Sequence, residues 1–336
     1  MVVLLVCKAK PFFVMVRTLR ETKPISAILE NVAGLEHRYV DDGEERITCL
    51  EFILRFLRRE CPEYFFCVIP PALSCPTASG FRVRRPREYI LVASQSHFHE
   101  YADEAAFGVE ARRIFAALVG FTAQAMPSAS EPALLSAIGS ALPSADTRPR
   151  TTAVFCRCSW RAPCPQHPCS SRCHCRGDPL RFDRCAWRRR HQEAWSRLPP
   201  AQQAYSYFED VWSTFGIDAE MRVSSPRERD LLNLRVAEHG GVAHCKNALL
   251  DISQSYGWDQ WRPDGIAPTL ATGSAIFSIG AGCRLTPQHL FALMGFPSTH
   301  RYEDVAPSRL TMLLGNTMHV ASVGFAASTL LAMRSA

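Results

Sequence analysis

A glutamate placed directly after a short apolar run is the first residue that could carry chemistry. Residues 25–29 read Ile-Ser-Ala-Ile-Leu and are followed by Glu30. In an α/β protein, the residue after a buried strand lies at the edge of the sheet where ligands bind. Apolar surroundings there favour the protonated acid, which can donate a hydrogen bond. Glu30 is therefore a candidate ligand-binding acid, and the alternative is a loop or helix-capping carboxylate.

A group of arginines precedes a second apolar, β-rich run at residues 89–92. The four side chains are Arg82, Arg84, Arg85 and Arg87. Guanidinium groups match phosphate and carbonyl acceptors. Because a strand follows directly, we expect these arginines at one end of the sheet. Taken alone, however, a basic run of this kind is typical of a solvated surface.

Seven of the 14 cysteines lie between residues 156 and 185. Thiolates together with imidazoles suit Zn²⁺, which binds four ligands tetrahedrally. The expected ligands are Cys156, Cys158, Cys164, Cys169, Cys173 and Cys175, with His167, His174 and Cys185 as further candidates. Nine arginines between residues 157 and 190 also favour a phosphate-contacting face. Since the spacing is not a pair of C-x-x-C motifs, the alternative is a cysteine-rich insert without metal, whose arginines are solvated.

Two further motifs stand near the C-terminal end. Residues 284–297 predict a helix with Thr286 as its N-cap, Pro287 in its first turn and Gly295 at its end. Residues 315–317, Gly-Asn-Thr, come before a final helical segment. By themselves these two motifs predict only structure.

The composition is that of an ordinary soluble globular protein. Of the 336 residues, 47% are apolar and 21% are charged, and the net charge of +6 suits an anionic partner without requiring one. We expect no membrane span, because no apolar run reaches the roughly 18–20 residues needed to cross a bilayer. The apolar N-terminus lacks the flanking features of a signal peptide. The cysteines are therefore expected in a reducing compartment.

Helical and strand patterns alternate along the first part of the chain. Apolar spacing and apolar runs predict helices at residues 12–21 and 48–59 and strands at 25–29, 64–69 and 89–92. This alternation predicts an α/β fold with a largely parallel sheet. Further helices are expected at residues 102–121, after Ser225, at 287–294 and at 318–333.

Taken in order, the motifs resemble the C5-cytosine methyltransferase family. The tripeptide Glu30-Asn31-Val32 is similar to that family's ENV motif, and Arg85 and Arg87 match the two arginines of its R-x-R motif. Residues 284–297 resemble its R-x-x-T-P…G-F-P element, and residues 315–317 resemble its closing G-N-S/T motif. The resemblance covers about residues 10–92 and 265–330. It implies a partial Rossmann-like, S-adenosylmethionine-dependent methyltransferase sheet with a large irregular Cys-rich target-recognition insert.

The resemblance also implies roles for individual residues. The family rotates the target cytosine out of DNA into a pocket. A cysteine thiolate then attacks C6 of the base, and S-adenosylmethionine supplies the methyl group to C5. By this resemblance Glu30 holds N3 of the base, Arg87 contacts its O2 side, Arg85 supports Arg87, and Asn316 contacts the cofactor. The implied partner is DNA, from which a nuclear localisation would follow.

The chain departs from the family's pattern in ways that bear on activity. The glycine-rich cofactor loop and the Pro-Cys-Gln nucleophile loop precede ENV in the family, and the 29 residues before Glu30 contain neither. Val83 replaces the usual glutamine, and Met318 replaces the usual valine. Because the covalent step needs a thiolate, we expect no methylation by this chain alone. In place of the missing strands we expect an unpaired apolar sheet edge. A truncated gene model, a split enzyme completed by a second chain and a decayed paralogue all fit this pattern.

The expected organisation has three parts. Residues 1–92 form part of the catalytic core, residues 93–264 the target-recognition region, and residues 265–336 carry motifs that pack back on the core. The middle part contains an expected linker at 123–152 and a predicted zinc segment at 153–190. Two alternatives remain open: a tRNA-directed cytosine-5 methyltransferase relative, and a non-catalytic zinc or nucleic-acid-binding module.

Overall fold

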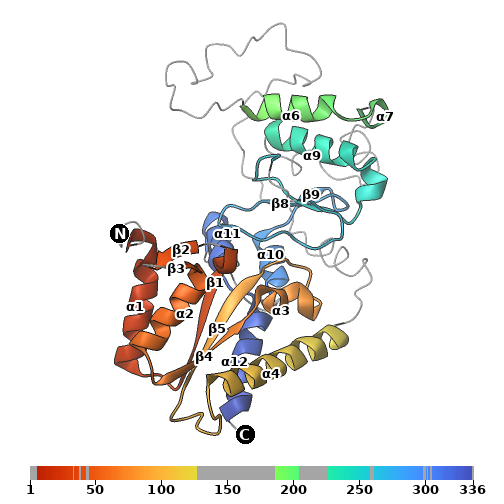
Figure 1. Cartoon of the computed structure of the whole chain (residues 1–336). Coiled ribbons are helices and arrows are strands. Elements are labelled where there is room, and N and C mark those ends of the chain that lie inside the picture. The colour runs from red at the N-terminus through yellow and green to blue at the C-terminus, as the bar shows by residue number, and fades with distance from the viewer. Residues whose placement is uncertain are drawn as a thin grey trace. The chain divides into compact units, whose positions relative to one another are not determined.

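The structure is a computed structural model in which two compact units can be described. It describes residues 6–32, 34–37, 39–42, 45–126, 186–203, 226–257, 261–297, 300, 302 and 305–334. Unit 1 comprises Met1–Pro127, Met294–Phe296 and Met318–Ala336, and unit 2 comprises Ser128–Leu293 and Pro297–Thr317. Figure 1 shows the chain coloured along its length.

The elements of unit 1 include most of the helices and strands expected from the sequence. They are α1 (Val6–Thr22), β1 (Ser26–Val32), η1 (Leu35–His37), β2 (Tyr39–Asp42), β3 (Glu45–Thr48), α2 (Cys49–Glu60), β4 (Tyr64–Ile69), α3 (Pro71–Ser74), η2 (Pro76–Ser79), β5 (Arg87–Ser94), α4 (Glu104–Ala125) and α12 (Val320–Arg334). Each of the three predicted strands is present. The short antiparallel pair β2–β3 was not predicted.

A three-stranded sheet in the order β1-β5-β4 forms the centre of unit 1. Both pairings are antiparallel: Ser26 of β1 lies opposite Ala93 of β5, and Ile69 of β4 lies opposite Tyr89. The prediction of a largely parallel sheet is therefore wrong for the described residues. Apolar runs located the strands, but an apolar run does not encode the direction of its partner. Unit 1 is thus mixed α/β with a small antiparallel sheet.

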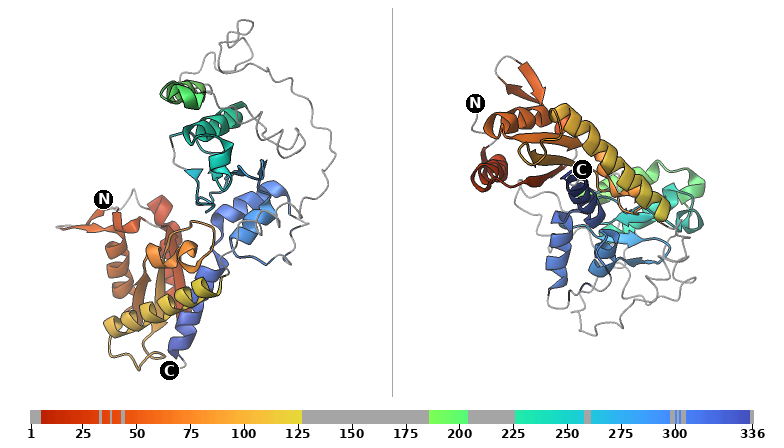
Figure 2. Two further views of the ribbon diagram at one scale, coloured as in Figure 1. Left: turned by 90° about the vertical axis from the view of Figure 1, so that its right-hand side faces the viewer. Right: turned by 90° about the horizontal axis from the view of Figure 1, so that it is seen from below.

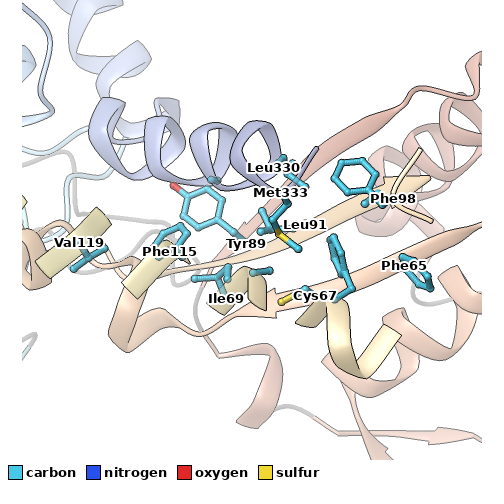
Figure 3. Packing of buried hydrophobic residues seen from close by; sticks show 14 residues of the cluster. Phe65, Cys67, Ile69, Tyr89, Leu91, Phe98, Phe115, Val119, Leu330 and Met333 are labelled. Carbon is cyan, nitrogen blue, oxygen red and sulfur yellow. The ribbon is translucent and has the colours of Figure 1, made fainter. Parts of the chain in front are cut away.

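Helices cover both faces of this sheet (Figures 1 and 2). On one face, Phe107 and Phe115 of α4 and Leu330 of α12 pack with alternate residues of β4 and β5. Figure 3 shows Tyr89 and Leu91 packed against Leu330 and Met333 on this side. On the other face, α1 and α2 pack with Phe66, Ile90 and Val92. Since a buried Leu or Phe side chain contributes about 1.5–3 kcal/mol, these two clusters are the main stabilising feature of unit 1.

Local sequence signals set the ends of the first two helices. Helix α1 ends at Thr22, because proline at position 24 disfavours helical backbone at the residue before it. Lys23 leaves the helix with a left-handed φ of 44°. At the start of α2, the Thr48 side chain accepts a hydrogen bond from the Glu51 N–H at 3.1 Å. These boundaries agree with the predicted helices to within a few residues.

Helix α4 belongs to unit 1, although the sequence assigned its residues to the target-recognition region. It packs on β4 and α12 and runs to Ala125. Asp103 caps it by accepting a hydrogen bond from the Ala106 N–H at 2.8 Å. Residues 127–185, with most of the expected linker and zinc segment, lie outside the described residues.

Unit 2 contains short helices and a four-stranded sheet. Its elements are α6 (Ala186–Ser196), α7 (Pro200–Gln203), α9 (Pro226–Glu238), η4 (Val242–Cys245), β6 (Leu249–Asp251), β7 (Trp261–Arg262), β8 (Ile276–Ser278), β9 (Cys283–Arg284), α10 (Pro287–Leu293) and α11 (Pro307–Asn316). The strand order is β7-β6-β8-β9, with every pairing antiparallel. Leu232, Leu250 and Phe277 lie in its core.

A buried carboxylate organises the end of β6. Asp251, 1% exposed, accepts hydrogen bonds from the backbone N–H of Ser253 at 3.0 Å and of Ala275 at 3.1 Å. The hydroxyls of Ser253 and Ser274 donate to the same carboxylate at 2.6 and 2.7 Å. Asp251 therefore joins the turn after β6 to the residues that lead into β8.

Helix α10 has the predicted start and stop. Pro287 is its first residue, and the Thr286 hydroxyl accepts a hydrogen bond from the His289 N–H at 3.4 Å. Gly295 follows the helix with a left-handed φ of 83°. Arg284, just before this helix, pairs with Glu228 of α9. The motif at residues 284–297 thus has a structural explanation within the described residues.

The stretch Arg309–Arg334 is long and apolar enough to cross a membrane by length and composition alone. It contains α11 and α12, which belong to different units. Helix α12 also buries Ala326, Leu330 and Met333 in the core of unit 1. Since the core helix of a soluble protein passes the same test, this single stretch is weak evidence for a membrane span.

Candidate functional site

The structure brings the side chains of Glu30 and Arg87 into contact on one face of the unit 1 sheet. In the β1–β5 pairing, Glu30 lies opposite Tyr89, and Arg87 lies opposite Val32, so the two charged residues are diagonal neighbours. Arg87 Nε lies 2.5 Å from Glu30 Oε1. The N–H is not aligned for a hydrogen bond, so the contact is an ion pair. The side chains are 12% and 26% exposed, which leaves Glu30 within reach of a ligand.

The surroundings of Glu30 differ from the apolar environment expected from the sequence. The preceding strand is apolar, but the antiparallel neighbour brings a guanidinium against the carboxyl group. If β5 were parallel to β1, other residues of β5 would lie beside Glu30.

The start of β5 is held by two neighbouring elements of unit 1. The Ser74 hydroxyl of α3 donates to the Arg87 carbonyl oxygen. In turn, the Ser322 hydroxyl of α12 donates to the Ser74 carbonyl oxygen at 3.0 Å, and both serines are buried. The backbone at Arg87 is therefore tied to α3, and α3 in turn is tied to α12.

Arg85 is buried close to this ion pair, with 2% of its surface exposed. Burial, and next the neighbouring Arg87 guanidinium, lower the pKa of Arg85 to about 10, while Glu30 acts in the opposite direction. The group still carries its charge at neutral pH. The site therefore combines two guanidinium groups with one carboxyl group, a balance that suits a ligand rich in carbonyl or anionic acceptors.

Tyr89 is a site residue that the sequence interpretation missed. It lies opposite Glu30 in the sheet and is 1% exposed. Burial first, and then the Glu30 carboxylate, raise the pKa of Tyr89 to about 12, so its phenol remains protonated. The period of two in a strand could have identified it, because residues 87 and 89 share a face.

Glu88 points to the opposite face and holds the turn that follows β1. It is 1% exposed and lies opposite Asn31. Its Oε1 accepts a hydrogen bond from the Gly34 N–H at 3.4 Å. Gly34 has a φ of 116°, which favours glycine. Burial raises the pKa of Glu88. No sequence motif pointed to this residue.

Asn316 lies in unit 2, at the C-terminal end of α11, and its side chain is exposed. The sequence placed residues 315–317 before the final helix, but Gly315 and Asn316 complete α11, and Thr317 is its C-cap. A Cβ on Gly315 would lie 2.2 Å from the backbone nitrogen of Thr272, so this glycine permits a close backbone contact within unit 2.

The predicted zinc ligands all lie outside the described residues: Cys156, Cys158, Cys164, Cys169, Cys173 and Cys175. Within the described ranges, no group of three or more His, Cys, Asp or Glu side chains is placed to hold a metal. Burial raises the pKa of Cys67 and of Cys245 to about 11. These two thiols are therefore protonated at neutral pH and are not activated nucleophiles.

Comparison of the chain with protein-family models and with curated proteins finds no match.

Proposed function

We propose that this chain is a DNA (cytosine-5-)-methyltransferase-like protein whose unit 1 carries the part of the site that holds a flipped cytosine. The single observation that supports the proposal most is the contact between Glu30 and Arg87. The two residues were selected by separate motifs, 57 positions apart by their numbers, and they meet on one face of one sheet. We further propose that unit 1 is part of a Rossmann-like sheet that depends on S-adenosylmethionine.

Glu30 and Arg87 offer complementary groups to the edge of cytosine. The Arg87 guanidinium donates to O2, and the Glu30 carboxyl group donates to N3 once it has left Arg87 and taken up a proton from solvent. When the base binds, the Glu30–Arg87 contact opens, and each side chain exchanges its partner for the ligand. Arg85 keeps a second positive charge beside the base, and the Tyr89 phenol stays neutral. These interactions hold and polarise the ring without attacking it.

Methyl transfer also needs a nucleophile and a donor that these residues do not supply. Attack at C6 requires a thiolate, and the buried thiols of Cys67 and Cys245 are protonated. S-adenosylmethionine would supply the methyl group, and Asn316, an exposed amide, is the proposed contact for it. We therefore propose that the chain does not methylate alone; a second chain that supplied the missing part would complete it.

A base-specific binding experiment tests the proposal. A DNA duplex with one mismatched cytosine is compared with the same duplex carrying thymine, because a mismatched base costs less energy to extrude. We expect the cytosine duplex to bind more tightly, and E30A and R87A to remove that preference at a loss of about tenfold to a hundredfold, equal to about 1.4–2.8 kcal/mol.

The matched control is E110Q, which breaks the exposed Arg113–Glu110 ion pair of α4, also 2.5 Å long. This variant should bind both duplexes as the unchanged chain does. Equal affinity for the two duplexes, with a steep dependence on salt, would instead support the non-catalytic nucleic-acid-binding alternative. Preference for an RNA stem with the same mismatch would support the tRNA-directed relative.

A structural Zn²⁺ in the cysteine-rich segment is part of the same proposal. It rests on the composition of residues 156–185, where seven cysteines and two histidines could satisfy a tetrahedral ion. Such an ion would contribute about 10–16 kcal/mol of binding energy to ordering the segment. The zinc content of the purified full chain, before and after chelation, is the deciding measurement.

A further inference from the structure

The two edge strands of the unit 1 sheet, β4 and β1, differ in how they are covered. At one edge, β4 is buried along nearly its whole length, with Tyr64, Phe66 and Ile69 at 3%, 4% and 0% exposure. The outward-pointing N–H of Phe66 donates to Oε2 of Glu104 at 3.3 Å, and α4 packs along the strand. A helix and its first carboxylate therefore close the β4 edge.

The other edge, formed by β1, is open among the described residues. Its apolar residues are only half-buried, although Ile28 packs on one core cluster and Ala27 and Leu29 pack on the other. β1 pairs with β5 on one side, and no described strand pairs with it on the other side. The strand thus has the apolar character of a central strand and the position of an edge strand.

The hydrogen bonds to β5 fix which peptide groups face the open edge. The Ile25 carbonyl accepts from the Ser94 N–H at 2.9 Å. Antiparallel pairing alternates, so residues 25, 27 and 29 direct their peptide groups to β5. Ser26, Ile28 and Glu30 consequently direct theirs outward. Such a row of donors and acceptors is a template for another strand.

We propose that a second copy of this chain pairs on this edge, with β1 antiparallel to β1 about a twofold axis. The occupant must be apolar on both faces, because helices cover both faces of the sheet. It must also present no carboxylate opposite Glu30, since like charges directly opposite each other are destabilising. In one register β1 itself meets both requirements. This inference does not rest on the proposed function.

Repulsion between the two Glu30 carboxyl groups favours the register in which the twofold axis passes through Ile28. With the axis at Ile28, this residue faces the partner's Ile28, and Glu30 faces the partner's Ser26. With the axis at Glu30, two carboxyl groups would face each other. In the first register every hydrogen-bonded pair uses the outward-facing residues 26, 28 and 30. The result is a continuous six-stranded antiparallel sheet.

Helix α12 supplies further apolar surface beside the edge. It packs on β1 and β5, yet Val320 is 42% exposed and Leu331 is 64% exposed. A few paired residues bury much less than the roughly 1,200–2,000 Å² of a stable interface. The exposed face of α12 is therefore a necessary part of the contact, and its exposed Gly324 and Ser328 permit close approach.

Sedimentation of the full chain over a range of concentrations tests the proposal. We expect a monomer–dimer equilibrium. S26P removes an outward N–H while keeping the bonds to β5, so it should weaken the dimer at least tenfold and leave the melting temperature unchanged at concentrations where the chain is monomeric. S26A is the matched control and should leave the equilibrium unchanged. S26K places an ammonium opposite the partner's Glu30 at two symmetry-related positions and should tighten the dimer by up to about thirtyfold.

Amide hydrogen exchange of the unchanged chain gives an independent test that does not depend on whether a variant folds. On raising the concentration of the unchanged chain, the amides of Ser26, Ile28 and Glu30 should gain protection. Those of Ala27 and Leu29 should be protected already at low concentration. A monomer at every concentration overturns the proposal, as does a dimer that S26P leaves intact or one in which the amides of β1 gain no protection.

Discussion

The two units of this chain are stabilised in different ways. In unit 1, an apolar sheet lies between two layers of helices, and the residues that fill its centre, such as Leu57 and Leu91, are 0% exposed. In unit 2 the strands are two or three residues long, and polar contacts tie the loops to them. Arg227, for example, donates to the Gln254 carbonyl at 2.8 Å. Satisfied buried polar groups thus add to the apolar core of unit 2 by fixing its loops.

The tryptophans make this difference measurable. All six lie between residues 160 and 261, outside the sequence ranges of unit 1, and the described Trp195 and Trp261 pack in apolar clusters of unit 2. Tryptophan fluorescence reports on unit 2 alone, whereas amide exchange of β5 reports on unit 1. For a prediction about the stability of one unit, the measurement on the other unit therefore serves as a control.

The largest effect is expected for D251A in unit 2. This change leaves four donors without their acceptor: the N–H groups of Ser253 and Ala275 and the hydroxyls of Ser253 and Ser274. At about 1–3 kcal/mol for each buried unsatisfied group, unit 2 should lose about 4 kcal/mol or more. Denaturant unfolding followed by tryptophan fluorescence measures it, with D264N, a change at an exposed side chain, as control. An equal loss of protection in β5 would show that the units unfold together.

A somewhat smaller effect is expected for L91A in unit 1. Leu91 is 0% exposed and packs in the cluster formed by β4, β5, α4 and α12. Removing its side chain should cost about 2–5 kcal/mol through lost burial and a residual cavity. Exchange of the β5 amides should accelerate while the fluorescence midpoint stays constant. V109A, at a position of α4 that is 63% exposed, should change stability by less than about 0.5 kcal/mol.

The smallest effect is the expected loss of unit 2 stability at acid pH. Burial first, then the nearby Arg227 and Arg235, lower the pKa of His191 in unit 2 to about 4. Between pH 6.5 and 4 the unfolded chain binds a proton that the folded chain does not, so His191 makes unit 2 lose stability as the pH falls through this window. The loss should be about 1–3 kcal/mol. H191Q should flatten the fluorescence-detected stability across the window, and an unchanged slope would contradict the assignment.

The sequence predicted local features well and pairings poorly. Thr286 was predicted correctly as an N-cap, and the helix expected from residue 48 begins there, since capping depends on neighbours within one turn. Strand direction was wrong, because the same apolar run suits either partner orientation. The strands of unit 2 gave no periodic signal over two or three residues. In the site, motif matching selected Glu30 and Arg87 and missed Tyr89, which the alternation of side chains along β5 places on the same face as Arg87.

Gly315 carries a consequence for anyone who studies the Gly-Asn-Thr motif by mutation. A side chain there would force apart two main-chain segments, α11 and residues 271–272, which approach to 2.2–2.4 Å of the added carbon. A scan of substitutions would thus identify position 315 as intolerant, even with no ligand nearby. Loss of activity in a G315A protein would be a folding phenotype. The neighbouring exposed amide, replaced in N316A, is the position where a defect would report on recognition.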